Sequence, residues 1–386
     1  MYQEQALARR PLLGLQLAAA SRELRIANVI EGGAAARAGV RAGDRLLAID
    51  ERPLQTAPEL AEAARVLRTG ARIAFRLERE GTEIELVGEL PAFPVESIEG
   101  GEVLLAHVEV DGHRLRTLYA VPSAPGPHGA ILYMQGVRAD SCEAPLDPTH
   151  PTRRLVEAFV RAGFVVSRVE RSGVGDSEGP SPRVTDLAAE RAGYEAALRD
   201  LRGFDEIDPQ RIFLFGHSFG GILAPLVARD VAGAAVFGAS PLRWLDCMLG
   251  TTRRLRGESD VARWGELFRL VFRDGLTPAR VFAEHPRLRE LRSRDCEGET
   301  MYGRHVSLFQ QLDAIDLEAA WRGVSTRVLA MHGELDAICS GDEARAIAEL
   351  SRGQHVELPG VDHDLLAAGT WDGQVASEAV RWMVKR

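Results

Sequence analysis

The stretch "RIFLFGHSFGG", residues 211–221, places a serine between two glycines at the end of an apolar run. The run "RIFLF" has the length and composition of a buried strand, and "GILAPLVARD" after it is typical of a buried helix. In a Gly-x-Ser-x-Gly pattern between a strand and a helix, the serine occupies a strained turn, and Gly216 and Gly220 must be small for the two elements to approach. Ser218 is therefore a candidate nucleophile, the alternative being a residue that only caps the helix.

The chain after residue 100 alternates between short apolar runs and helical stretches. Examples of the runs are "GAILYMQG", "GFVVSRVERSG" and "TRVLAMHGELD", and an example of the helical stretches is "DLAAERAGYEAALRDLR". This alternation predicts a mostly parallel sheet with helices on both faces, preceded by a hairpin of "EVLLAHVEV" and "RLRTLYAVP". Sites in such sheets lie at the carboxyl ends of the strands, where Ser218 falls.

A serine hydroxyl is a weak nucleophile and needs a base and an acid that orients the base. Two candidates come after Ser218 in the chain. Asp336 follows the predicted strand "TRVLAMHGEL", and His363 follows the predicted strand "QHVELPG". We expect these two side chains to meet Ser218 at one edge of the sheet.

Other polar residues compete for these roles. Asp246, after "AGAAVFGAS", is an alternative acid, and Glu334 is a less favoured one. His217 and His332 also flank strand ends, but we interpret both as packing residues. Cys339 lies just after the candidate acid and is interpreted as a small loop residue.

From about Gly101 to Arg386 the chain resembles the alpha/beta hydrolases, in which nucleophile, acid and histidine follow in that order. The resemblance implies that Asp336 holds the imidazole of His363 and that His363 shuttles the proton of Ser218.

The resemblance also implies an oxyanion hole. One N–H donor would be that of Phe219, directly after the nucleophile, and the other that of Val137. Many relatives carry His-Gly at the second position, where this sequence has Gln135-Gly136. The departure leaves the backbone donor in place and changes the wall of the pocket.

Residues 241–325 interrupt the alternation and contain two predicted helices, "ARWGELFRLVFRDG" and "RHVSLFQQLDAIDLEAAWRG". An insertion at this point resembles the helical cap of alpha/beta hydrolases. Four aromatic residues could line an apolar acyl pocket under it, although aromatic stripes more often simply pack in a core: Trp264, Phe268, Phe272 and Phe309.

The first ninety residues read as short strands around one helix at 58–68. "EGGAAARAGVRAGDRLLAIDERPL", preceded by Leu13-Gly14-Leu15, resembles a PDZ domain. The resemblance implies that these three residues form the loop that binds a peptide's terminal carboxylate. No histidine stands at the start of the helix, so no preference for Ser or Thr in the ligand is expected. The alternative is a domain that only docks on its neighbour or dimerises.

Composition and short motifs exclude several classes of partner and cofactor. The net charge of -9 argues against nucleic acid and anionic membranes as partners, and no apolar stretch is long enough to span a membrane.

The N-terminal "ALARRPLLGLQLAAA" imitates a secretory signal, but it fits the first PDZ strand instead. The four cysteines lack metal-ligand spacing, which favours free thiols in a reducing, cytoplasmic location. "ERSGVGDSEGP", residues 170–180, lacks the third glycine of a dinucleotide motif, so no cofactor or metal is expected.

Together these observations predict four segments: a PDZ-like domain at 1–90, hydrolase cores at 91–240 and 326–386, and a helical cap at 241–325. The predicted function is a serine hydrolase that cleaves an ester, thioester or amide through an acyl-enzyme on Ser218. The expected partners are a small-molecule or peptide acyl substrate and a protein C-terminus at the PDZ groove. The alternatives are an acyltransferase or cyclase with the same triad and a catalytically silent PDZ scaffold.

Overall fold

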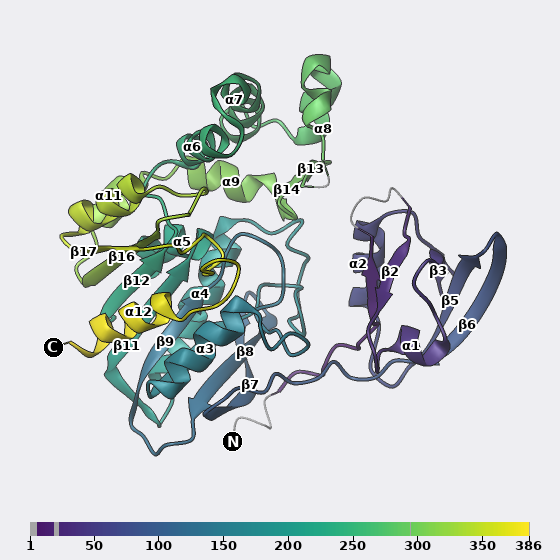
Figure 1. Cartoon of the computed structure of the whole chain (residues 1–386), viewed down its shortest axis with the longest axis horizontal. Helices are drawn as coiled ribbons and strands as arrows, with labels where there is room; N and C mark the ends of the chain where they lie inside the picture. Colours follow the sequence, from purple (N-terminus) through teal and green to yellow (C-terminus); the bar gives the residue numbers. More distant parts are fainter. Residues whose placement is uncertain (1–5, 19–22, 294, 386) are drawn as a thin grey trace. The chain divides into compact units, whose positions relative to one another are not determined.

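The computed structural model describes residues 6–18, 23–293 and 295–385. It divides into two compact units (Figure 1). The first is Ala8–Val95 and the second contains Glu96 and the chain that follows it. Parts of the predicted PDZ-like segment, residues 1–5 and 19–22, lie outside the described residues.

The first unit is rich in short strands. β1 pairs antiparallel with β2, and four further strands form a sheet in the order β4-β3-β5-β6. β5 and β6 form a hairpin across Glu80-Gly81, with Arg79 opposite Thr82. The strands are β1 Leu15–Leu17, β2 Ile26–Val29, β3 Arg45–Ile49, β4 Arg52–Pro53, β5 Arg72–Arg79 and β6 Thr82–Glu89.

Two helices complete this unit, α1 (Ala34–Ala38) and α2 (Ala57–Arg65). A capping box starts α2, since Thr56 and Glu59 each accept the other's backbone N–H. The helix ends at Arg65, three residues before the predicted end at residue 68. The chain tightens there into a turn, in which the Leu67 N–H donates to the Ala64 carbonyl.

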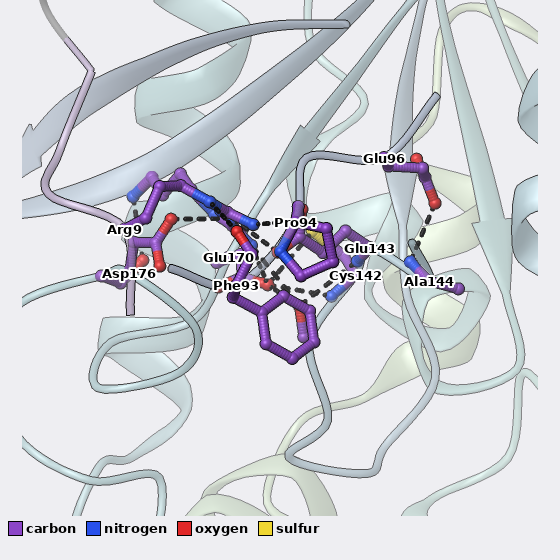
Figure 2. A network of polar contacts seen from close by, with 12 residues as sticks. Arg9, Phe93, Pro94, Glu96, Cys142, Glu143, Ala144, Glu170 and Asp176 are labelled. Atoms are coloured by element: carbon purple, nitrogen blue, oxygen red, sulfur yellow. Dashed lines mark hydrogen bonds and ion pairs between the residues drawn. The ribbon is translucent and has the colours of Figure 1, made fainter. Parts of the chain in front are cut away.

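The segment around Pro91 and Pro94 packs on the first unit. The Leu12 N–H donates to the Pro91 carbonyl at 2.8 Å. The Arg9 guanidinium donates to the carbonyls of Phe93 and Pro94, at 3.2 and 2.7 Å (Figure 2). The segment that we expected to open the hydrolase core therefore belongs to the first unit, because its extended carbonyls find donors there.

The second unit is built on an eight-stranded sheet in the order β17-β16-β12-β11-β9-β10-β8-β7. Neighbours are parallel except at the edge, where β8 is antiparallel to both β10 and β7. The predicted opening hairpin is therefore that edge. The strands are β7 Gly101–Val110, β8 His113–Pro122, β9 His128–Met134, β10 Phe164–Val169, β11 Ile207–His217, β12 Gly233–Phe237, β16 Arg327–Gly333 and β17 Gln354–Leu358.

Helices cover both faces of this sheet. α3 (Pro151–Arg161) and α12 (Gln374–Val384) share one core with alternate residues of the strands, among them Phe213 and Phe215. The intervening residues, such as Ile212 and Leu214, pack with the other helices. These are α4 Leu187–Arg202, α5 Phe219–Val227 and α11 Gly341–Ser351. The predicted α/β class is confirmed. Within the described ranges, no helix has both the length and the apolar character needed to cross a membrane.

Most of the insertion between β12 and β16 gathers at one end of the sheet (Figure 1), while its last helix packs on α5 and α11. The single helix that we predicted over "RHVSLFQQLDAIDLEAAWRG" is two helices, because the Asp316 side chain accepts the Ala319 N–H and starts a new one. A three-stranded sheet was also missed, since each of its strands has only two residues. The elements are α6 Trp244–Arg256, α7 Glu258–Phe272, α8 Pro278–Glu284, a 3-10 helix Pro286–Leu291, β13 Cys296–Glu297, β14 Thr300–Met301, β15 Arg304–His305, α9 Val306–Asp313 and α10 Leu317–Arg322.

Candidate active site

Ser218 stands between β11 and α5 with a positive φ, which is rare for a residue other than glycine; its φ is 53° and its ψ is -120°. Its side chain makes no capping hydrogen bond to α5, unlike a simple helix cap. The flanking glycines are sterically required, because a Cβ at Gly220 would lie 2.0 Å from the Met134 carbonyl oxygen and one at Gly216 2.6 Å from Gly221 Cα. The strained turn thus presents the serine at the carboxyl end of the strand.

The structure brings the three predicted polar residues together. His363 Nε2 lies 2.9 Å from Ser218 Oγ, and His363 Nδ1 lies 2.8 Å from Asp336 Oδ2. The carboxylate can only accept, so Nδ1 donates to Asp336 and Nε2 is free to accept the serine proton. The distances suit proton transfer from hydroxyl to imidazole.

Asp336 is held as a carboxylate. Its Oδ1 accepts the N–H groups of Ile338 and Cys339 at 2.8 and 2.9 Å, and its side chain is fully buried. Burial raises the pKa of this carboxyl, but the hydrogen bond and charge of His363 together with the two N–H groups outweigh burial, so the net pKa is lowered.

His217 supports the loop that carries His363. Its Nε2 lies 2.8 Å from the His363 carbonyl oxygen, so this nitrogen carries a proton and donates. Burial, followed by repulsion from His363, lowers the pKa of His217 to about 4. We predicted only packing here; the sequence holds no local sign of this contact, because the two residues are far apart in the chain.

The competing residues lie elsewhere. Asp246 is half exposed in the first turn of α6 and faces Arg273 at 3.7 Å. Glu334 accepts the Gly360 N–H at 2.8 Å, and His332 is buried 3.7 Å from Glu357. Among the candidates, Asp336 is the carboxylate that contacts His363.

The two predicted oxyanion donors lie beside Ser218. Phe219 is the first residue of α5, a position whose N–H has no partner within the helix. Val137 lies in the loop after β9, and this loop passes close to the nucleophile, since a Cβ on Gly136 would sit 3.8 Å from Ser218 Cβ. Both residues line the same cavity as Ser218 and His363.

This cavity has a volume of about 430 Å³, within the usual range for small-molecule sites. The insertion contributes a largely apolar wall that includes Trp244, Met248, Leu255 and Tyr302. Trp264, Phe268, Phe272 and Phe309 are not among the lining residues. The three phenylalanines are buried and pack on one another and on Trp244, which matches the packing alternative.

A buried ionic cluster supports another part of the cavity wall, residues 141–144. Arg116 pairs with Glu143 and Glu170, both at 2.8 Å, and Glu170 also accepts the Cys142 N–H. Glu96 accepts the Ala144 N–H at 2.8 Å (Figure 2). These carboxylates fix the backbone of the wall. Across the described residues, no group of three or more His, Cys, Asp or Glu side chains could hold a metal ion.

The model of the alpha/beta hydrolase family matches residues 145–377, and a PDZ domain model matches residues 11–88. The chain belongs to the alpha/beta hydrolase family. The first match covers more than half of the chain and includes all three residues of the Ser218 site. The fold and both family resemblances inferred from the sequence are therefore confirmed.

Curated relatives of this hydrolase match over short stretches. Quorum-quenching protein AidA of Acinetobacter baumannii is 35% identical over 97 residues, which are 23% of this chain and 32% of the relative. Uncharacterized peptidase YtmA of Bacillus subtilis is 31% identical over 136 residues, 35% of this chain and 47% of the relative. Esterase EstD of Thermotoga maritima is 26% identical over 128 residues, which are 33% of this chain and 30% of the relative. The chain thus spans less than half the length of each of these proteins.

Solved structures share the hydrolase fold. Est1E from Butyrivibrio proteoclasticus with bound ferulic acid has a TM-score of 0.51 and 17% identity, covering 72% of this chain and 95% of Est1E. The complex of DcsB with a substrate analogue has a TM-score of 0.50 and 18% identity, covering 73% of this chain and 98% of DcsB.

The PDZ loop is shaped by its carbonyl groups. The carbonyls of Leu12 and Leu13 accept the N–H groups of Ala34 and Ala35, both at 3.0 Å, and the Gly14 carbonyl accepts another backbone N–H at 2.9 Å. Because the C=O and N–H of a trans peptide point in opposite directions, the N–H groups of the next three residues turn away from these partners. Gly14 has φ +79°, and a Cβ there would lie 3.0 Å from the Gly33 backbone.

Proposed function

We propose that this protein is a serine hydrolase that cleaves an ester, thioester or amide through an acyl-enzyme on Ser218. The observation that carries the proposal is the position of His363, within hydrogen-bonding distance of both Ser218 Oγ and Asp336 Oδ2. Three groups arranged in this order are what activates a serine hydroxyl.

The chemistry follows from the geometry. Ser218 Oγ bonds to the substrate carbonyl carbon while His363 Nε2 takes the hydroxyl proton, and the carbonyl oxygen becomes an oxyanion that accepts from the Phe219 and Val137 N–H groups. His363 then protonates the leaving oxygen, sulfur or nitrogen as its bond to carbon breaks. Water then attacks the acyl carbon while His363 Nε2 takes a proton from the water. The bond between that carbon and Ser218 Oγ breaks as Oγ receives the proton from His363, and the carboxylic acid leaves.

The cavity and the relatives favour an acyl group with apolar character. The insertion places Trp244, Met248 and Leu255 on the cavity wall, and these side chains offer apolar surface to an acyl chain. The names of two curated relatives, an esterase and a peptidase, support a carbonyl substrate of the ester or amide type.

We infer that the PDZ domain recruits a peptide or protein-tethered substrate or partner. The support is the loop Leu13-Gly14-Leu15, whose N–H groups point away from the backbone segment that bonds to the loop carbonyls. Such groups suit a terminal carboxylate, and the strand β1 after them pairs with β2 along one edge.

The test is labelling by a fluorophosphonate probe together with ester and aminoacyl-anilide hydrolysis. We expect Ser218→Ala and His363→Ala to abolish labelling, and Asp336→Asn to lower kcat by about 10³- to 10⁴-fold because the imidazole loses its orienting carboxylate. Asp246→Asn is the matched control and should change kcat by less than about twofold, since that carboxylate faces Arg273. A folded wild type that the probe does not label would contradict the proposal, as would labelling that survives Ser218→Ala.

A further inference from the structure

Three consecutive carbonyls of the loop after β9 accept from buried arginines. Arg171, two residues beyond β10, donates to the carbonyls of Gly136 and Arg138, both at 2.5 Å. Arg304, in β15 of the insertion, donates to the Val137 carbonyl at 3.4 Å. The loop that carries the proposed second oxyanion donor is therefore fixed by side chains from two other parts of the chain.

Glu190 of α4 joins the two arginines. Its Oε1 lies 2.8 Å from Arg171 Nε and its Oε2 lies 2.7 Å from a terminal nitrogen of Arg304. All three side chains are at most 5% exposed. Burial raises the pKa of Glu190, but the two arginines lower it by more, so the net pKa lies below its usual value. The cluster thus holds one negative and two positive charges.

We propose that Arg171 is a positioning residue for the oxyanion hole, supported by Glu190 and tied to the cap by Arg304. The inference rests on the proposed serine hydrolase function. The Val137 N–H belongs to the same peptide unit as the Gly136 carbonyl, and in a trans peptide the two point in opposite directions. By fixing that carbonyl, Arg171 fixes the direction of the N–H donor.

The same contact strengthens the donor. A cation on the carbonyl oxygen of an amide polarises the peptide unit, and hydrogen bonds in such a chain reinforce one another in a low-dielectric interior. The cluster also carries a net charge of about +1 behind the loop, and preorganised positive charge stabilises an oxyanion more than it stabilises a neutral carbonyl.

The neighbouring peptide is held as well. The Gln135 N–H donates to the Tyr194 hydroxyl of α4 at 3.2 Å. A Cβ at Gly220 would collide with the Met134 carbonyl and also approach the Gln135 carbonyl, so the loop has no room to shift toward the elbow. Arg171 therefore acts on a loop whose start is already fixed.

The test compares Arg171→Met with Arg153→Met in the full-length protein. Arg153 is a matched control, since its side chain is 10% exposed against 5% for Arg171 and pairs with a buried glutamate, Glu157. We expect Arg171→Met to lower kcat for a nitrophenyl ester by about tenfold to hundredfold with KM within threefold, because only the transition state needs the oxyanion donor. A boronic acid, which mimics the tetrahedral intermediate, should bind more weakly by the same factor. Arg153→Met should leave both within threefold.

Two further variants test the proposal even if Arg171→Met fails to fold. Arg171→Lys keeps a charge for Glu190 but cannot reach two carbonyls, and Arg304→Met removes the tie to the cap. We expect each to lower kcat and boronate affinity together, by about threefold to tenfold. Equal kcat in Arg171→Lys and wild type, or a kcat loss without loss of boronate affinity, would overturn the positioning role. A wild type that fluorophosphonate does not label would instead overturn the proposed function.

Discussion

His217 should make the stability of the second unit depend on pH. Its pKa is about 4 in the folded protein and about 6.5 in an unfolded chain. Between these values the unfolded state binds a proton that the folded state does not, so stability is full above about pH 6.5 and falls as the pH drops toward 4. The slope from this one group approaches about 1.4 kcal/mol per pH unit.

The comparison is with His217→Gln, which keeps an N–H donor for the His363 carbonyl but does not titrate. Urea unfolding followed by tryptophan fluorescence reports the second unit alone, because all five tryptophans follow residue 95. We expect the variant to lose less stability than the wild type between pH 7 and pH 4.5. Other titrating groups are common to both proteins and cancel. Parallel stability curves would show that His217 is not buried in its neutral form.

Single residues were predictable where a local pattern marks them. Ser218 stands in a glycine-flanked turn, and Asp336 and His363 each follow a recognisable strand. Arg171 was not found, because its partners at residues 136–138, 190 and 304 come from separate parts of the chain. Its own stretch, residues 170–180, carries an incomplete dinucleotide motif and no local pattern that marks Arg171.

At the scale of elements, α6 is attached to the loop that carries Asp336. Thr251 Oγ1 donates to the Ile338 carbonyl at 2.8 Å, and Arg254 donates to the carbonyls of Ala337, at 3.2 Å, and Ile338. The same part of α6 forms cavity wall through Leu255. We infer that these contacts hold the apolar wall in place over the acyl group.

Arg254→Ala should therefore raise KM for a long-chain nitrophenyl ester by about fivefold, the equivalent of about 1 kcal/mol from lost hydrogen bonds. kcat should stay within twofold, since Thr251 still donates to the Ile338 carbonyl and Asp336 keeps its two N–H donors. The KM for the acetate ester should also stay within twofold, since the short acyl group does not depend on the wall at Leu255. Arg253→Ala is the control, because Arg253 is half exposed and pairs only on the surface with Glu258. An equal KM change for acetate and long-chain esters would place the effect elsewhere.

The elements that could be predicted from the sequence are those long enough to repeat their apolar pattern several times. The core strands and helices were predicted because each carries several apolar residues in a repeating pattern. The insertion was harder, since β13, β14 and β15 have two residues each and no period to detect. Asp316 inside a continuous apolar pattern also separates two helices that were predicted as one.

At the scale of the whole molecule, a PDZ domain and a hydrolase in one chain predict that substrates with a free C-terminus are favoured. An ester joined by a flexible linker to a peptide bound at the Leu13-Gly14-Leu15 loop would reach a millimolar effective concentration. We expect kcat/KM for such esters, drawn from a library with randomised last residues, to exceed that of their amidated forms by about tenfold to hundredfold for the best members.

Gly14→Ala should remove this advantage and leave untethered esters unaffected. The substitution is strained by φ +79° and brings a Cβ to 3.0 Å from the Gly33 backbone, so the loop must move. Gly43→Ala is the matched control, because Gly43 has φ +92° but open space around its Cβ position, and it therefore carries a similar backbone penalty without displacing the loop. If free and amidated peptides gave equal kcat/KM throughout the library, carboxylate capture would have no part in substrate selection. The first unit would then serve another contact, while hydrolysis at Ser218 would stand on its own evidence.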